Sequence, residues 1–280
     1  MPSDSIRKPV VAFIGGGNMA GSMIGGLIAA GWPASCVRVA EPLESRREEL
    51  ARSHGISCFE NNTPCIKGAD LVVLAVKPQV LKQVVRALAK PLLDASPLLI
   101  SIAAGIRGGD ILHWVGGEMP FVRVMPNTPA LVNRGVSGMW ANQLVRPEQR
   151  AAAEETMRAV GEVVWVEDES LIDTVTGISG SGPAYFFKMM ELMLDAAEQH
   201  GLDSESAKTL VVETAIGAAT LIRNGNQAPA ELRRRVTSPG GTTEAGIRAM
   251  EDHGIDDAVH SGIGAAVVRS RELSDQFGGD

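Results

Sequence analysis

Residues 10–20 read Val-Val-Ala-Phe-Ile-Gly-Gly-Gly-Asn-Met-Ala, and this stretch decides the fold. Its first five residues are apolar and mostly β-branched, as in a strand that is buried on both faces of a parallel sheet. Gly-x-Gly-x-x-Ala follows at residues 15–20, and an apolar helical pattern then runs to Gly31. A glycine-rich turn between a strand and a helix is the dinucleotide-binding fingerprint, because its glycines let the backbone turn tightly and approach the pyrophosphate. The residues expected to bind the dinucleotide here are Gly15, Gly17, Asn18, Met19 and Ala20.

The next apolar run, residues 37–40, ends at Glu41. An acidic residue at this position usually binds the ribose 2′-hydroxyl of NAD and repels the 2′-phosphate of NADP. Ser45, Arg46 and Arg47 follow closely, and they either hold that phosphate or are solvated residues of a surface helix. These residues therefore leave both NADPH and NADH open as the cofactor.

Three further strands are predicted at residues 71–76, 98–102 and 121–125, and each ends in small residues or proline. Ligands of an open parallel sheet bind beyond the carboxyl ends of its strands. The segments that follow these strands are therefore candidate cofactor-lining loops, and they include Lys77, Pro78 and Asn127.

Strand signals stop after about Val166, once two strands at 136–140 and 163–166 have flanked a helix at 148–160. Residues 179–183, Ser-Gly-Ser-Gly-Pro, are typical of a turn in which Ser181 caps the next helix. That helix is predicted from Ala184 to about His200, and its broad apolar side indicates burial against a partner subunit.

Further helices are expected at 204–224, 229–236, 242–253 and 256–276. The chain is therefore predicted to be of the α/β class, with two domains. An N-terminal Rossmann NAD(P)-binding domain is expected at residues 1–166, and an all-α dimerisation and substrate domain is expected at residues 167–280.

The composition excludes several classes of function. The chain has 280 residues and a net charge of −7, which argues against a nucleic-acid or membrane-surface role. Its three cysteines form no Cys-x-x-Cys pair, so no metal site is expected, and the usage fits a reducing cytoplasm.

The second informative stretch lies near the C-terminus, where residues 237–244 read Thr-Ser-Pro-Gly-Gly-Thr-Thr-Glu. The proline ends the preceding helix, and the two glycines permit positive φ and a close approach of the backbone to a ligand. Thr242 or Thr243 is expected to cap the next helix. A helix N-terminus that opens from such a turn suits a small anion such as a carboxylate. Taken alone, the local pattern favours a plain corner between two helices with a Ser/Thr cap.

Several motifs together resemble one family, Δ1-pyrroline-5-carboxylate reductase. They occur in family order, and they span residues 13 to 243, nearly the whole chain. The matching segments are residues 13–19, 75–78, 101–105, 125–130, 179–185 and 237–243. The glycine fingerprint alone is widespread, whereas the last two segments are specific in combination.

The resemblance implies an enzyme of proline biosynthesis that reduces the cyclic imine L-1-pyrroline-5-carboxylate to L-proline with NAD(P)H. It implies a cytoplasmic homodimer and, in many members, a ring of dimers. By the same resemblance, Thr243 contacts the ring nitrogen and is the catalytic residue, and the loop around it cradles the substrate carboxylate. The residues of that loop are Ser238, Pro239, Gly240, Gly241, Thr242 and Thr243.

The resemblance also implies that Asn62 and the loop Ala75, Val76, Lys77 and Pro78 line the cofactor. Glu41 stands where many NADPH-preferring members carry a small polar residue. NADPH is the cofactor that the resemblance implies, and the departure at Glu41 leaves NADH as the alternative.

Two other functions fit parts of this sequence. A β-hydroxyacid dehydrogenase shares the order of the two domains, but its catalytic lysine would fall at Phe186, and Lys188 lies two residues further on, about 200° around the helix. A cofactor-binding scaffold without turnover would not need the intact loop at residues 238–243.

Overall fold

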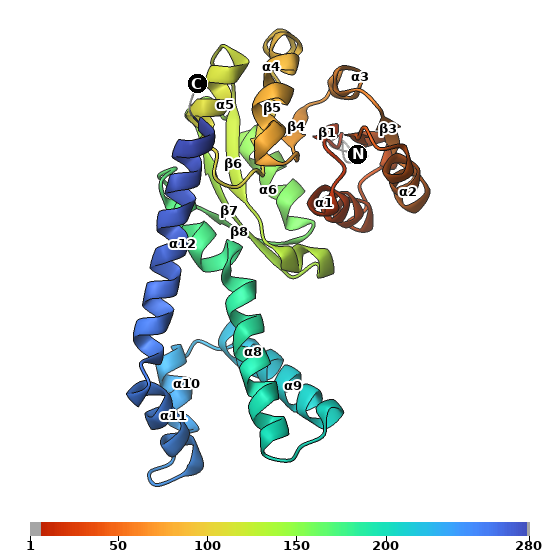
Figure 1. Cartoon of the computed structure of the whole chain (residues 1–280). Coiled ribbons are helices and arrows are strands. Elements are labelled where there is room, and N and C mark those ends of the chain that lie inside the picture. Colours follow the sequence, from red (N-terminus) through yellow and green to blue (C-terminus); the bar gives the residue numbers. More distant parts are fainter. Residues whose placement is uncertain (1–6, 279–280) are drawn as a thin grey trace, which may run out of the picture. The chain divides into compact units, whose positions relative to one another are not determined.

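The structure, a computed structural model, describes residues 7–278 and divides into two compact units. The first unit extends to Ser181 and resumes at Ala265, and the second comprises Gly182–Gly264. The chain thus leaves the first unit once, and its last helix returns to it (Figure 1). The sequence predicted one boundary, at residue 166, between a cofactor-binding domain and a dimerisation and substrate domain. That functional boundary stays a prediction.

The first unit is built on one sheet, which has eight strands within the described residues in the order β3-β2-β1-β4-β5-β6-β7-β8. The first six follow the strand order of the dinucleotide-binding fold, whose order reverses between β1 and β4. The strands are β1 (Val11–Ile14), β2 (Val37–Ala40), β3 (Ser57–Phe59), β4 (Leu71–Leu74), β5 (Leu98–Ser101), β6 (Phe121–Met125), β7 (Gly135–Ala141) and β8 (Gly161–Trp165).

Helices connect these strands along the chain (Figure 1). The α-helices of this unit are α1 (Asn18–Ala29), α2 (Glu44–His54), α3 (Asn62–Ile66), α4 (Pro78–Ala95), α5 (Gly108–Val115), α6 (Pro147–Arg158) and α7 (Leu171–Val175). Two short 3₁₀ helices, η1 (Ala34–Cys36) and η2 (Thr128–Val132), and a π-helical turn, η3 (Thr176–Gly180), complete it.

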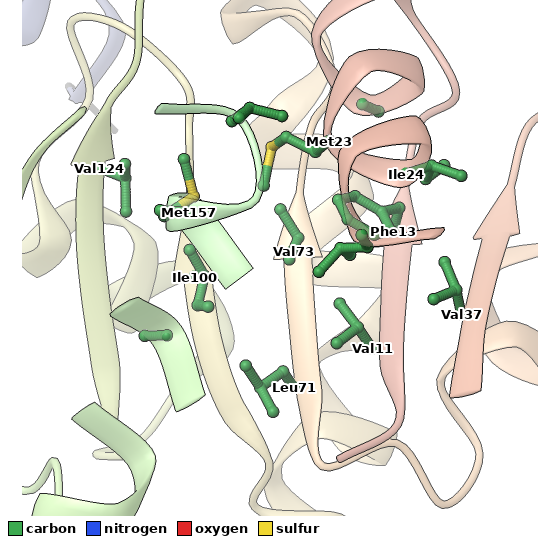
Figure 2. Close-up of a cluster of buried hydrophobic side chains, with 14 of the residues drawn as sticks. Val11, Phe13, Met23, Ile24, Val37, Leu71, Val73, Ile100, Val124 and Met157 are labelled. Carbon is green, nitrogen blue, oxygen red and sulfur yellow. The ribbon is translucent and has the colours of Figure 1, made fainter. Parts of the chain in front are cut away.

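The core lies on both faces of the sheet, because successive side chains of a strand point to opposite faces. On one face Val11 and Phe13 of β1 pack with Met23 and Ile24 of α1 and with Met157 of α6 (Figure 2). On the other face, apolar residues of α3, α4 and α5 cover the alternate strand positions. Strands buried on both sides explain why the sequence shows continuous apolar runs rather than alternation.

Two features of the sheet were not predicted from the sequence. Strand β7 runs antiparallel to β6, whereas every other neighbouring pair in the described sheet is parallel. Only nine residues, 126–134, join β6 to β7, which is too short for the crossover that a parallel pair needs. Strand β3 was not predicted, since its three residues, Ser-Cys-Phe, are only partly buried and carry no period.

The second unit is helical, as predicted, with α8 (Gly182–Gln199), α9 (Ser204–Asn224), α10 (Pro229–Arg235), α11 (Thr242–Asp252) and the first part of α12 (Ile255–Gly278). Helix α8 packs against α9, which begins where the Asp203 side chain accepts a hydrogen bond from the Ser206 N–H. In the single chain, Phe186 and Phe187 of α8 are 67% and 63% exposed. So large an exposed aromatic surface marks an interaction site.

The C-terminal part of α12 is held on the first unit by polar contacts. The Ser270 hydroxyl donates to the Asp173 carboxylate at 2.7 Å, and Arg107 pairs with Asp275 at 2.6 Å. Asp173 lies 3.8 Å from the guanidinium of Arg123, which is only 3% exposed. Within residues 7–278, no helix combines the length and the apolar character that crossing a bilayer requires.

Candidate cofactor and substrate sites

The turn after β1 is tightly constrained at its first glycine. Gly15 has φ = +99°, a conformation that glycine adopts without strain, and its N–H donates to the Ala40 carbonyl at 2.8 Å. A Cβ at Gly15 would lie 2.8 Å from the Ala75 carbonyl oxygen and 2.9 Å from the Val76 side chain. The turn is therefore packed directly against the residues that follow β4.

The start of α1 has the chemistry of an anion site. Gly17 is the N-cap residue, it makes no side-chain capping bond, and a Cβ built on it meets nothing within 4 Å. The first helical hydrogen bond runs from Gly21 N–H to the Gly17 carbonyl, so the amides of residues 18–20 have no partner within the helix. Such amides, with the positive end of the helix dipole, bind phosphate groups. The cradle therefore fits the pyrophosphate of a dinucleotide.

The Glu41 carboxylate lies beside this turn, at the end of β2. One oxygen accepts from the Gly16 N–H at 2.8 Å, and the other accepts from the Leu43 N–H at 3.0 Å. Two backbone donors thus fix a half-buried negative charge where the ribose of a dinucleotide lies in this fold.

The two arginines after Glu41 also bond to backbone. The Arg46 Nε donates to the Gly16 carbonyl at 2.7 Å, and the same guanidinium pairs with Glu49 at 2.7 Å. Arg47 donates to the carbonyls of Glu41 and Pro42, at 2.9 and 2.7 Å. Neither is a freely solvated residue of the helix surface, since Arg46 bonds to the glycine turn and Arg47 bonds to the loop that carries Glu41.

The other predicted cofactor residues all follow carboxyl ends of strands of the same sheet. Ala75 and Val76 come directly after β4, and the Ala75 N–H donates to the Ile14 carbonyl at 2.8 Å. Asn62 begins α3, three residues after the end of β3, and Asn127 follows β6 by two residues. The fold therefore gathers the predicted cofactor residues at one edge of the sheet, with Glu41 and the glycine turn among them.

The predicted substrate residues lie in the second unit, between α10 and α11. Gly240 has φ = +71°, and the Gly241 N–H donates to the Ser238 carbonyl at 3.0 Å, which closes a tight turn. The first helical bond of α11 runs from Ala245 to Gly241, so the amides of Thr242 and Thr243 have no partner within the helix. Both threonines are exposed. The loop thus presents backbone donors and hydroxyls together.

Neither Thr242 nor Thr243 caps α11, which corrects that prediction. Gly241, in an extended conformation, is the N-cap residue and makes no side-chain capping bond, so both threonines are already helical. The capping contact comes from Glu244, whose carboxylate accepts from the Gly240 N–H at 2.7 Å. The sequence signal for it was an acid three residues after the N-cap, the spacing of a capping box.

The turn predicted at residues 179–183 is also more regular than expected. Residues 176–180 form a π-helical turn, and the Ser181 N–H closes it by donating to the Thr176 carbonyl at 2.8 Å. Ser181 therefore ends one helical segment, and α8 begins at Gly182.

Together, the reversal of strand order, the glycine turn and the uncapped start of α1 define a Rossmann dinucleotide-binding protein, here joined to a helical unit. Residues 169–273 match the family model described as pyrroline-5-carboxylate reductase dimerisation. Residues 10–105 match one described as NADP oxidoreductase coenzyme F420-dependent.

Relatives match along almost the entire chain. A pyrroline-5-carboxylate reductase of Pseudomonas aeruginosa is 48% identical over 98% of this chain and 100% of its own length. The solved structure of a pyrroline-5-carboxylate reductase from Coxiella burnetii is 40% identical, with a TM-score of 0.92 over 96% of this chain and 99% of that one. A Plasmodium falciparum pyrroline carboxylate reductase, solved with NADP bound, is 28% identical, with a TM-score of 0.85 over 95% of this chain and 98% of that one.

The chain belongs to the pyrroline-5-carboxylate reductase family, which makes it an NAD(P)H-dependent oxidoreductase. The predicted fold class, a Rossmann domain followed by a helical dimerisation domain, is confirmed.

Proposed function

We propose that this chain reduces L-1-pyrroline-5-carboxylate to L-proline by hydride transfer from NADPH to the cyclic imine. NADH is the alternative hydride donor. The observation that carries the proposal is the loop between α10 and α11, in which a Gly-Gly turn leaves the amides of Thr242 and Thr243 without helical partners. A carboxylate placed at these amides would meet the positive end of the α11 dipole. We assign the binding of the substrate carboxylate to residues 238–243.

The same loop supplies a hydroxyl for the reacting nitrogen. Thr243 is the second residue of α11, so its exposed side chain belongs to the turn whose amides bind the carboxylate. Its hydroxyl both accepts and donates, and it orients the N–H of a protonated imine while the carboxylate stays fixed. A hydroxyl is a weak general acid, so Thr243 acts by orienting the nitrogen, and a water completes the proton relay.

The nicotinamide group, when bound, supplies the hydride and the redox chemistry. The chain binds and positions the dinucleotide. The amides of residues 18–20 hold the pyrophosphate, Glu41 and Asn62 lie on the adenosine side, and Ala75, Val76, Lys77 and Pro78 line the neighbouring loop. A protonated imine is already a strong electrophile, so the residues described need only hold, orient and shield the reactants.

The active form is a homodimer, and we extend this to a ring of dimers in the cytoplasm. Support for the dimer comes from the exposed aromatic face of α8, which lies within the segment matched by the dimerisation model. The three cysteines are all free thiols, which supports a reducing compartment.

The test compares Thr243→Ala with Thr237→Ala. The Thr237 hydroxyl donates to the Arg233 carbonyl at 2.7 Å, so Thr237→Ala removes a hydroxyl that is bonded to α10 and lies outside residues 238–243. Thr243→Ala should keep wild-type affinity for NADPH and lose about 100-fold in kcat, the order that one positioned polar group contributes. Thr237→Ala should keep both. Wild-type turnover in Thr243→Ala would remove Thr243 from the mechanism.

A further inference from the structure

Asn127 uses both ends of its side-chain amide within the protein. Its Oδ1 accepts from the Val136 N–H at 2.9 Å, and its Nδ2 donates to the Ser179 carbonyl at 3.1 Å. The residue is only 8% exposed. One side chain thus joins the end of β6, the start of β7 and the π-helical turn η3.

The turn that Asn127 holds is an unusual element. The π-helical bond from Ser181 N–H to the Thr176 carbonyl inserts one extra residue into the turn, and such turns occur frequently at functional sites. It also lies beside the last residue of β6, because a Cβ at Gly180 would meet the terminal methyl group of the flexible Met125 side chain. The turn therefore lies next to the carboxyl end of β6.

This end of the sheet belongs to the nicotinamide half of the site. In a doubly wound sheet the two halves of a dinucleotide lie on either side of the point where the strand order reverses, here between β1 and β4. Because Glu41, at the end of β2, lies on the adenosine side, the other half lies over β4, β5 and β6. Asn127 follows β6, and the chain passes from η3 directly into α8 of the second unit.

We propose that Asn127 is a positioning residue, which acts through the Ser179 carbonyl by fixing the π-helical turn at the nicotinamide end of the cofactor site. This differs from the direct cofactor contact that the sequence suggested for Asn127. It rests on the proposed function, because the role concerns the geometry of hydride transfer. A displacement of about 1 Å at a reacting centre costs roughly 100-fold in rate.

Asn127→Asp tests this role, since it keeps the shape of the side chain and an acceptor for Val136 but places a carboxylate oxygen against the Ser179 carbonyl. The chain offers a matched control at the other end of the β6–β7 pair. Asn142 accepts from the Phe121 N–H at 3.1 Å and donates to the Met119 carbonyl at 2.9 Å, so Asn142→Asp breaks the same kind of clamp away from the cofactor edge.

Four quantities are measured in both variants: Tm, the kinetic constants for pyrroline-5-carboxylate, the affinity for ADP, and amide hydrogen exchange at Ser181. ADP reports on the adenosine half alone. Asn127→Asp should lose about 100-fold in kcat/KM and exchange faster at Ser181, while ADP affinity is unchanged. Asn142→Asp should lower Tm by about as much as Asn127→Asp does. It should keep wild-type kcat/KM and wild-type protection of the Ser181 amide from exchange.

Wild-type kcat/KM in Asn127→Asp would overturn the inference, as would an equal loss in Asn142→Asp, because a general weakening of the β6–β7 pair would then explain the effect. If the wild type does not turn over pyrroline-5-carboxylate, the proposed function fails instead. In that case, wild-type hydrogen exchange at Ser181 in Asn127→Asp would still refute the claim that Asn127 fixes the π-helical turn. Faster exchange at Ser181 with intact ADP affinity would support that claim.

Discussion

Replacing the two outer glycines of the β1–α1 turn separately should give opposite phenotypes. In Gly15→Ala, the new methyl group must accept φ = +99° and lie 2.8 Å from the Ala75 carbonyl oxygen. In Gly17→Ala, the backbone already has φ = −64°, and the methyl group meets no protein atom within 4 Å. Gly15→Ala is therefore expected to lower the stability of the fold, and Gly17→Ala is expected to weaken cofactor binding.

The magnitudes follow from these contacts. A strained backbone conformation costs about 1–3 kcal/mol, and an overpacked contact costs a similar amount, so Gly15→Ala should lose about 4 kcal/mol. For a protein of this size, that loss lowers Tm by about 10 °C. Gly17→Ala changes a glycine N-cap to alanine, which costs under about 1 kcal/mol. Its methyl group stands where the pyrophosphate approaches, and about 1–3 kcal/mol of overpacking there weakens NADPH binding roughly 10- to 100-fold.

Thermal unfolding followed by circular dichroism without cofactor, and fluorescence titration with NADPH, measure the two effects separately. The expected pattern is a large Tm loss for Gly15→Ala and near-wild-type Tm with weak NADPH binding for Gly17→Ala. Wild-type NADPH affinity in Gly17→Ala would refute the assignment of this turn as the pyrophosphate seat, and an unchanged Tm in Gly15→Ala would refute its packing against Ala75.

Three further predictions concern the cofactor, the dimer and a buried thiol. Glu41→Ser removes a fixed negative charge beside the ribose, so the NADPH-to-NADH ratio of kcat/KM should rise about tenfold. Replacing the exposed Glu44 by serine should leave that ratio unchanged. An unchanged ratio in Glu41→Ser would contradict the role of the carboxylate. Phe186→Lys should cost at least about 2 kcal/mol of association free energy, which raises the dimer Kd roughly 30-fold in sedimentation. Leu144→Lys in the first unit should leave the dimer Kd unchanged. An intact dimer in Phe186→Lys would place the interface elsewhere. Burial raises the pKa of Cys65 from 9.0 to about 12, so the folded thiol stays neutral while the unfolded thiol ionises above pH 9. Stability is therefore lost as pH rises from 9 towards 12, and by pH 10 the wild type should have lost about 1.4 kcal/mol more than Cys65→Ala in urea unfolding; parallel losses would contradict the shift.

The sequence predicted those parts of the fold in which one local signal decides the structure. Strands buried on both faces give continuous apolar runs, so β1, β2 and β6 were found within one residue of their observed ends. The helices of the second unit were found because Pro, Gly and Asp mark their ends. Strand β3 escaped, since three residues are too few to show a period.

Features that depend on contacts between distant residues could not be predicted. Neither residue 127 nor residue 179 signals in its own surroundings that one amide joins them. The bonds from Glu41 to the glycine turn are of the same kind, as they join residues 25 positions apart. By contrast, the Glu244 contact was accessible from its spacing, and it was missed because the adjacent threonines offered an equally good local cap.

Reduction of the imine is tested most directly by the initial rates of NADPH and NADH oxidation by the pure protein with pyrroline-5-carboxylate, at equal cofactor concentrations. We expect turnover that depends on the imine, with L-proline as the product and a rate ratio between the two cofactors that changes in Glu41→Ser. Absence of turnover with either cofactor, in protein shown by titration to bind both, would contradict it.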